Sequence, residues 1–467
     1  MANQSILSLG CLVVNLYIEK RVDMSKRFSP IAFSLCLALL GSTVSSITFG
    51  AEKEQPGNDV LAQQEAAIPT DIEVPEGLPL EELRRFSEVF ESIKRAYVEP
   101  VSDKKLLEDA ARGMLIGLDP HSSYLAQDDY SELQIQTAGE FGGVGIEVSQ
   151  EDGVIRVITP MDGTPAMKAG IKPGDIIIKI DGEIIQSIGV DKAVSMMRGE
   201  PGSEIILTIG RDGKNVPFDV SLKRELISVS SISHRYLEQG LGYIRVSQFQ
   251  HHSARDLKDA LSQLQQDDAL KGLVIDLRNN PGGLLSAAVD ISDAFIDSGT
   301  IVSTKGREAN SSVIYGATKA LAIADIPIIV VINGGSASAS EIVAGALQDT
   351  KRAIILGTTS FGKGSVQTVV ALTGDRAIKL TTAKYYTPSG RSIQAQGIVP
   401  DIVVEQAHVE ENSPHGFRVK EKDLAGHLEN AEQETAKVAS NHLLETDFQL
   451  HEAVNLLKGL TIYQSIK

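Results

Sequence analysis

The stretch IPIIVVINGGSASASE, residues 326–341, indicates more about this chain than any other. Residues 326–332 are rich in β-branched side chains and predict a buried strand. Glycines at 334 and 335 break the strand, and EIVAGAL, residues 341–347, predicts a helix. A strand, a glycine turn and a helix N-terminus can hold a serine in a strained, exposed position beside N–H groups that bind an oxyanion. An ordinary strand–helix connection in an α/β protein fits equally well.

Length and composition restrict the class of protein. A chain of 467 residues predicts two or more domains. With 42% hydrophobic and 22% charged residues, its composition is that of a globular protein. The formal net charge of −17 argues against nucleic acid and anionic membrane surfaces as partners.

The N-terminal region predicts a secretory signal within residues 1–50. A short basic segment at 24–27 precedes an apolar run at 31–40 and small residues up to Gly50, where we expect cleavage. Met24 is then the expected true start, with residues 1–23 as an upstream extension. The apolar run is short for a membrane span, so we expect membrane association only if the signal stays uncleaved. The predicted location is the periplasm.

Both cysteines, Cys11 and Cys36, lie within this N-terminal region. The exported chain would therefore contain no thiol. This excludes disulfides, thiolate metal sites and a cysteine nucleophile in the predicted mature protein.

The segment that follows predicts a leader and a small helical region. Residues 51–77 are polar, contain three prolines and predict a flexible leader. Residues 78–137 contain a first helix with apolar side chains at helical spacing, from Leu83 to Tyr97, and a second helix at 106–118. Such a small unit buries little alone, so we expect it to pack on another domain or subunit.

Residues 138–223 predict a self-contained β-rich domain that resembles a PDZ domain. Its motifs are FGGVGIEV at 141–148 and PAMKAGIKPGD at 165–175. The resemblance implies that the glycine-rich loop binds the C-terminal carboxylate of a peptide while a strand edge pairs with the peptide backbone. A small β-barrel whose glycines only form turns is the alternative. The implied loop residues are Phe141, Gly142, Gly143, Val144, Gly145 and Ile146.

Residues 224–404 predict an α/β domain, because strands at 243–249, 272–277 and 326–332 alternate with helices at 253–264, 284–295 and 340–347. The tail, residues 405–467, is polar until a predicted terminal helix at 450–460.

A catalytic serine needs a base, and no histidine lies between His252 and His408. His251 and His252 are expected to cap a helix or face solvent. The segment GTTSFGKGSVQ, residues 357–367, offers Lys363 instead. A lysine can act as a base only if burial lowers its pKa, and Gln367 could orient its amine. A solvated surface lysine is the alternative for Lys363.

The same segment nearly matches a phosphate-binding loop, GxxxxGK followed by serine or threonine. Residue 364 is glycine where the magnesium ligand should be, and the following residues predict a strand where that motif has a helix. Nucleotide binding is therefore the weaker interpretation of Lys363.

In order along the chain, the motifs resemble the carboxyl-terminal processing (tail-specific) peptidases, which are Ser/Lys serine proteases with a PDZ domain. The resemblance covers about residues 80–401. The motifs that carry it, besides the PDZ-like domain, are LDPHS at 118–122, RNNPGG at 278–283, GSASASE at 335–341, SFGKGSVQ at 360–367, YYTPSGRSI at 385–393 and GIVPD at 397–401.

The resemblance implies a multi-domain α/β (α+β) fold with a crotonase-like protease core and an inserted PDZ domain. It implies Ser338 as nucleophile, Lys363 as general base and Gln367 as its orienting partner. The implied oxyanion donors are the N–H of Ala339 and one from the Gly282–Gly283 turn. Ser336 and Ser340 would supply small volume and a helix cap, and Arg198 would couple the two domains.

The implied function is an exported serine endopeptidase that recognises protein C-termini and cleaves peptide bonds through an acyl-enzyme, without metal or other cofactor. Its implied partners are protein or peptide substrates with free C-termini, further copies of the chain and a helical-repeat adaptor protein. A catalytically silent PDZ scaffold of the cell envelope is the alternative.

Overall fold

The computed structural model describes most of the chain after residue 78. The predicted signal and leader, and most of the polar tail, lie outside the described residues. The described residues are 79–151, 154–185, 189–267, 270–308, 310–319, 321–323, 325–407 and 446–466.

A six-stranded sheet forms the centre of the α/β domain. Every position of its two central strands is buried, as expected for a mostly parallel sheet that is covered on both faces. Only the first pair of strands is antiparallel. In sheet order the strands are β10 (Ile232–Glu238), β11 (Leu241–Val246), β12 (Gly272–Asp276), β15 (Ile328–Ile332), β16 (Ile354–Gly357) and β19 (Ile402–Val403).

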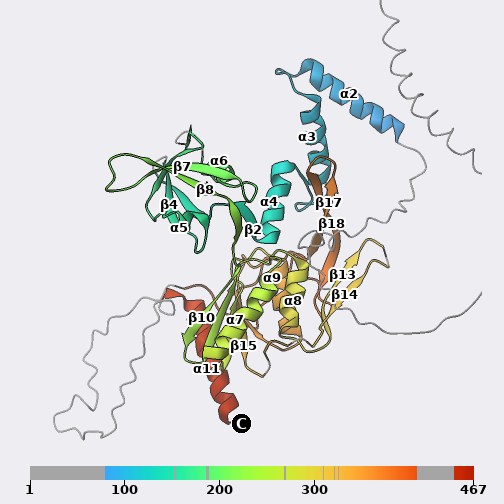
Figure 1. The fold of residues 1–467 in the computed structure, drawn as a ribbon. Helices are drawn as coiled ribbons and strands as arrows, with labels where there is room; N and C mark the ends of the chain where they lie inside the picture. Colours follow the sequence, from blue (N-terminus) through green and yellow to red (C-terminus); the bar gives the residue numbers. More distant parts are fainter. Residues whose placement is uncertain are drawn as a thin grey trace, which may run out of the picture. The chain divides into compact units, whose positions relative to one another are not determined.

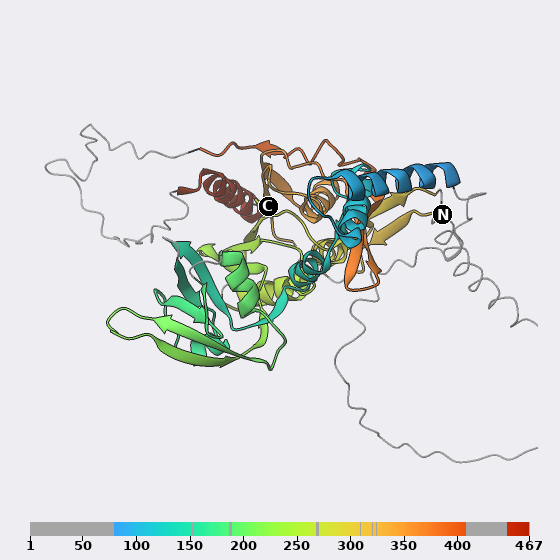
Figure 2. The ribbon, with the colours of Figure 1, turned by 90° about the horizontal axis from the view of Figure 1, so that it is seen from above.

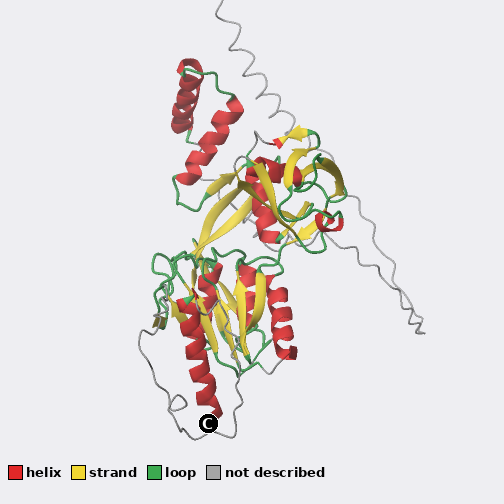
Figure 3. Cartoon of the chain, turned by 90° about the vertical axis from the view of Figure 1, so that its left-hand side faces the viewer, coloured by secondary structure: helices red, strands yellow, loops and turns green. Residues whose placement is uncertain are grey.

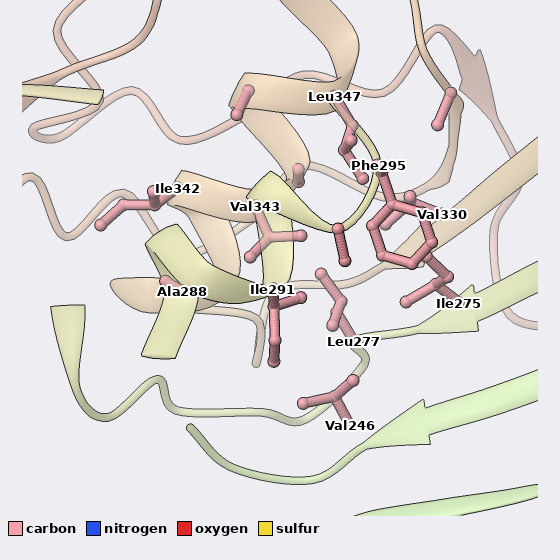
Figure 4. Close-up of a cluster of buried hydrophobic side chains, with 14 of the residues drawn as sticks. Val246, Ile275, Leu277, Ala288, Ile291, Phe295, Val330, Ile342, Val343 and Leu347 are labelled. Carbon is pink, nitrogen blue, oxygen red and sulfur yellow. The ribbon is translucent and has the colours of Figure 1, made fainter. Parts of the chain in front are cut away.

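Helices cover the two faces of this sheet (Figures 1 and 3). One face carries α7 (Ser253–Asp267), α8 (Leu285–Asp293) and α9 (Ala339–Asp349), whose apolar side chains join those of the strands in the largest core cluster (Figure 4). The opposite face carries α11 (Phe448–Ile466), which buries four side chains against it. The predicted terminal helix is therefore part of the α/β domain.

A second sheet combines one strand from the N-terminal region with four strands from the α/β domain. Its long strand pairs with β17 along one edge and with β1 and β13 along the other. The ladder between β17 and the long strand is irregular between Val366 and Gln367, and Gln367 pairs with Thr381. The strands are β1 (Ser123–Leu125), β13 (Thr300–Gly306), β14 (Val313–Gly316), β17 (Ser365–Leu372) and β18 (Arg376–Tyr386).

The N-terminal helices contribute little to any core. No residue of α2 (Leu80–Ala96) is buried, and α3 (Asp103–Ile116) buries only Leu115. An ion pair of 3.1 Å between Glu108 and Arg376 connects α3 to β18. Figure 2 shows α2 as the long blue helix of this region. The expectation that this unit buries little is confirmed. A third helix, α4 (Gln127–Ala138), leads into the next domain.

The β-rich domain has its own core of buried aliphatic side chains. Its sheet runs in the order β3-β4-β5-β7-β8, with β6 paired to β5, so β3 is an edge strand. A two-stranded ladder of β2 and β9 joins it to the rest of the chain. Its elements are β2 (Glu140–Gly143), β3 (Ile146–Glu151), β4 (Val154–Pro160), α5 (Pro165–Lys168), β5 (Ile176–Ile180), β6 (Glu183–Ile184), α6 (Val190–Met197), β7 (Glu204–Gly210), β8 (Phe218–Lys223) and β9 (Glu225–Ser228).

The multi-domain mixed α/β class is confirmed. Within the described ranges, no helix is both long enough and apolar enough to cross a membrane.

Leu457 provides a test of the position of α11. Its side chain is fully buried, and a Cβ added at Gly272 of β12 would lie 2.8 Å from its Cγ. Leu457→Ala should lower the free energy of unfolding by about 2–5 kcal/mol, because it leaves a cavity between helix and sheet. Urea unfolding measures this change.

Ile462→Ala, in the same helix but 60% exposed, is the matched control and should cost less than about 0.5 kcal/mol. Equal losses for the two variants would contradict the packing of α11 on the sheet.

Candidate active site

The candidate residues lie on three loops that follow neighbouring strands. The turn 278–283 follows β12, the stretch 333–338 follows β15, and the loop 358–364 follows β16. These strands are parallel and adjacent, so their carboxyl ends meet at one edge of the sheet. Ligands and catalytic groups of open α/β sheets gather at this edge.

Ser338 stands immediately before α9 in a rare backbone conformation. Its φ of 56° and ψ of −113° are unusual for a residue other than glycine. Such strain is typical of functional positions that the surrounding structure holds in place. The predicted elbow between strand and helix is therefore present.

The serines on either side of Ser338 anchor this elbow. The Ser336 hydroxyl donates to the carbonyl of Leu277 at 2.8 Å, and the Ser340 hydroxyl donates to that of Asn280 at 3.0 Å. Both side chains are fully buried. The prediction that one of them caps the helix is wrong, because the N-cap position is Ser338 itself. Their hydroxyls are used to join the elbow to the turn after β12.

Glu341 connects the Ser338 elbow to the loop that carries Lys363. One carboxylate oxygen accepts from the N–H of Ser338 at 2.8 Å and of Lys363 at 2.9 Å. The other accepts from the N–H of Gly362 at 2.7 Å and the hydroxyl of Ser360 at 2.6 Å. The side chain is fully buried. Sequence reasoning did not assign Glu341 a role, although the spacing Ser-x-x-Glu is a capping-box signal.

Lys363 lies in a partly buried position. Burial lowers the pKa of its amine, and the positive charge of Lys379 on β18 lowers it further, whereas the Glu341 carboxylate opposes the shift. A half-buried amine with a lowered pKa fits a proton acceptor better than a solvated surface lysine.

The phosphate-binding interpretation of the segment around Lys363 does not fit the structure. The loop with Lys363 leads into the strand β17, whereas a phosphate-binding loop leads into a helix. His251 is exposed, as expected, and the Nε2 atom of His252 lies 3.2 Å from a carboxylate oxygen of Glu140.

Gln367 lies at the start of β17, where its amide nitrogen donates to the carbonyl and the hydroxyl of Ser365 at 3.2 and 2.9 Å. Because the N–H groups are directed to Ser365, an interaction with the Lys363 ammonium would use the amide oxygen.

The turn after β12 packs directly against the elbow. An ideal Cβ on Gly282 would lie 2.8 Å from Cβ of Ser338 and 3.1 Å from the nitrogen of Ala339, so only glycine fits there. The N–H of Gly282 donates to the Asn280 side chain at 2.9 Å. Because this bond occupies the N–H of Gly282, the N–H of Gly283 is the better candidate for the second oxyanion donor beside Ala339.

Tyr385 contacts both the segment of Lys363 and that of Ser338, and sequence reasoning did not single it out for that. Its phenol donates to the carbonyl of Lys363, and its N–H donates to the carbonyl of Gly364 at 3.0 Å. The Ser338 hydroxyl is within hydrogen-bonding reach of the phenol. Burial raises the pKa of Tyr385 well above its usual range, so it stays an uncharged donor.

The turn of the LDPHS motif also reaches this region. Asp119 accepts from the hydroxyl of Thr381 at 3.1 Å, and the N–H of Thr381 donates to the Ser122 hydroxyl at 3.1 Å. Burial and the charge of Lys363 lower the pKa of His121. The turn therefore lies on β18 opposite Gln367 and close to Lys363.

Of the predicted carboxylate loop, residues 141–143 belong to β2, Ile146 begins β3, and only Val144 and Gly145 connect the two strands. Gly145 has a φ of 74°, and an ideal Cβ there would lie 2.4 Å from Thr164. Val144 is buried, and its carbonyl accepts from the N–H of Ala166 at 3.0 Å. The edge strand β3 contacts α6, so the elements of a peptide groove lie together.

Arg198 follows α6 and contacts two other segments. It forms an ion pair with Glu132 of α4, and its guanidinium lies 5.2 Å from the ring centre of Phe141. The next residue, Gly199, donates its N–H to the carbonyl of Gly142 at 3.0 Å. Arg198 therefore connects the end of α6, the carboxylate loop and α4.

Within the described part of the chain, no group of three or more His, Cys, Asp or Glu side chains could hold a metal ion.

Three family models match the chain. Peptidase family S41 matches residues 240–404, the PDZ domain matches residues 142–222, and the activating protease CtpB N-terminal domain matches residues 41–129. The first two coincide with the α/β domain and the β-rich domain of the structure.

Relatives with similar sequences span nearly the same length. A carboxy-terminal-processing protease of Bartonella bacilliformis is 47% identical over 81% of this chain and 88% of its own. A carboxyl-terminal-processing protease of Synechocystis is 36% identical over 82% and 88%. Among solved structures, the photosystem II D1 C-terminal processing protease is 30% identical over 69% of this chain and 93% of its own, with a TM-score of 0.41.

The charge of Lys379 can be tested for its effect on Lys363. Lys379→Met removes a neighbouring cation that disfavours the protonated amine, so the pKa of Lys363 should rise. Because only the neutral amine reacts with acylating reagents, the pH at which Lys363 is half-maximally labelled should move upward. Labelling followed by peptide mass spectrometry measures this midpoint.

Lys384→Met, on the same strand but exposed, is the control and should leave the midpoint unchanged. An unchanged midpoint in Lys379→Met would contradict the electrostatic contact.

Proposed function

Because the chain belongs to peptidase family S41 and to its carboxy-terminal processing proteases, we propose that it is an exported serine endopeptidase that recognises protein C-termini and cleaves peptide bonds by a Ser338/Lys363 mechanism. The observation that carries the proposal is the shared carboxylate of Glu341. It binds the backbone N–H of both residues and so fixes the nucleophile relative to the base.

The first step forms the acyl-enzyme. Ser338 Oγ attacks the peptide carbonyl carbon while its proton moves to the neutral amine of Lys363. The tetrahedral intermediate collapses as its C–N bond breaks, and the Lys363 ammonium returns the proton to the leaving amine. Water then attacks the ester carbon and gives a proton to Lys363. As the bond from that carbon to Ser338 Oγ breaks, the Lys363 ammonium passes the proton to Oγ, and the product leaves with a new C-terminal carboxylate.

The carbonyl oxygen becomes negatively charged during each attack. We assign its stabilisation to the N–H of Ala339, in the first turn of α9, and to the N–H of Gly283. Gly282 supports this arrangement by its close packing on Ser338 and by its bond to Asn280.

Substrate recognition is assigned to the PDZ domain. A peptide C-terminus would add to the outer edge of β3 beside α6, with its carboxylate at the N–H groups of residues 141–146. Arg198 would report this binding to α4, because its contacts with Phe141 and Glu132 span the loop and that helix.

The proposal of export to the periplasm rests on the basic and apolar segments at 24–27 and 31–40. The implied helical-repeat adaptor stays a prediction of the resemblance.

We also propose that α2 mediates self-association. Its apolar side chains lie at helical spacing and none is buried. Its first turn is acidic, with Glu81 and Glu82, and its last turn is basic, with Lys94 and Arg95. Two copies that pair antiparallel would bring opposite charges together and bury both apolar faces.

The catalytic assignment predicts loss of cleavage in two variants. Ser338→Ala removes the nucleophile and Lys363→Ala removes the base, so each should lower hydrolysis of casein by at least about a thousandfold. A fluorescence assay of casein cleavage by protein that lacks residues 1–50 measures this loss.

Ser338→Ala should still bind peptides through the PDZ domain, which serves as the control for folding. Cleavage that survives either substitution contradicts the site assignment. A wild-type protein that binds peptides but stays inactive when C-terminal peptides are added as activators would favour the silent scaffold.

The proposed α2 contact predicts a change of oligomeric state. Phe86→Glu places a charge on the apolar face of α2 and should convert the protein to a smaller species in sedimentation velocity experiments. Val216→Glu, at a 72% exposed position of the β-rich domain, is the control and should keep the wild-type distribution. Identical distributions for all three proteins would contradict the contact.

A further inference from the structure

The N-terminus of α11 meets the turn that follows β12. The guanidinium of Arg278 donates to both carboxylate oxygens of Asp447, at 2.8 and 2.7 Å, and to the side chain of Gln449 at 3.3 Å. The two charged residues are 169 positions apart in sequence. Arg278 is only 12% exposed, so this contact is shielded from solvent far more than a surface ion pair.

Arg278 is also bound by the strand from which it emerges. Its guanidinium donates to the buried carboxylate of Asp276 at 3.0 and 2.7 Å, and Tyr243 donates to the same carboxylate at 2.9 Å. Arg245 lies 3.6 Å from Asp276 and donates to the carbonyl of Arg278 at 3.1 Å. Two arginines thus face two aspartates, and the loss of Asp447 would leave a partly buried excess of positive charge.

The turn that begins at Arg278 sets the surroundings of Ser338. The carbonyl of Asn280 accepts from the N–H of Ala337 at 2.9 Å and from the Ser340 hydroxyl at 3.0 Å, on the two sides of the serine. The Asn280 side chain binds the N–H of Gly282. A shift of this turn would therefore move the nucleophile and the oxyanion donors relative to each other.

We propose that Asp447 is a positioning residue of the active site, which acts through Arg278 on the turn 278–283. Asp447 lies beyond the part of the chain that matches the S41 family model, which ends at residue 404. The proposal rests on the proposed function of Ser338 and extends the catalytic unit to the C-terminal helix.

Docking of α11 and charge pairing by Asp447 are separable. The helix is held on the sheet by Leu450, Val454 and Leu457, and Lys458 forms an ion pair of 2.7 Å with Glu238. Asp447 also caps the helix, since the N–H of Leu450 donates to it at 3.1 Å. Asparagine can replace aspartate as a cap but carries no charge, so it tests the pairing with Arg278.

The experiment compares Asp447→Asn, Asp447→Glu and Lys458→Met with the wild type. Asp447→Asn should lower kcat about a hundredfold with KM nearly unchanged, the loss typical of a small misplacement of reacting groups. Asp447→Glu keeps the charge and should recover most of the activity. Lys458→Met removes the other ion pair of the helix and should keep the wild-type kcat.

Wild-type kcat in Asp447→Asn would overturn the proposal. An equal loss in Lys458→Met would also overturn it, because docking of the helix alone would then explain the effect.

A second measurement does not depend on cleavage. Hydrogen exchange of residues 277–285 is compared between Ser338→Ala and the double variant Ser338→Ala/Asp447→Asn, and it should be faster in the double variant. Equal exchange would overturn the positioning role even if Ser338 is the nucleophile. Faster exchange in the double variant, together with cleavage by the Ser338→Ala protein, would support the role of Asp447 in holding the turn but would refute the proposed function of Ser338.

Discussion

The arrangement of the candidate active site depends on one buried carboxylate. Glu341 is fully shielded from solvent and accepts four hydrogen bonds, three from backbone N–H groups and one from a hydroxyl. A buried carboxylate is costly unless such donors surround it, so the four contacts together stabilise its burial. Its place in the first turn of α9 adds the favourable field of a helix N-terminus. The loop after β16 therefore cannot move without disturbing the elbow after β15.

The sheet topology explains why these loops meet. β12, β15 and β16 are neighbours in the sheet. They are not neighbours in sequence, because 51 residues lie between the end of β12 at 276 and the start of β15 at 328. Parallel pairing brings their carboxyl ends to the same edge. Because every position of β12 and β15 is buried, the two strands that lead into the turn and the elbow are packed on both faces. Such packing favours a preorganised site.

Sequence patterns predicted the elements that carry the chemistry better than the contacts between them. The apolar run before Asn333 predicted β15, and the glycines after it predicted the elbow, because both signals are local. The role of Glu341 was also within reach of a local signal, the spacing from Ser338. Tyr385 and Asp447 were not, since their partners Lys363 and Arg278 are defined only by tertiary structure. β18 was missed because its polar and apolar residues alternate irregularly across three different ladders.

The contacts between the β-rich domain and the surroundings of Lys363 are likewise defined only by tertiary structure. α4 contacts β2 at the carboxylate loop and also contacts β18, which pairs with β17 at Gln367. The turn at Asp119, just before β1, lies on that same part of β18. A packed route thus runs from Arg198 to the surroundings of Lys363. Contact alone does not make coupling, because a bound peptide shifts the site only if the two arrangements of α4 differ in affinity for it. We expect the ion pair of Arg198 with Glu132 to supply that difference, because a carboxylate bound at the loop would compete with Glu132 for the same guanidinium.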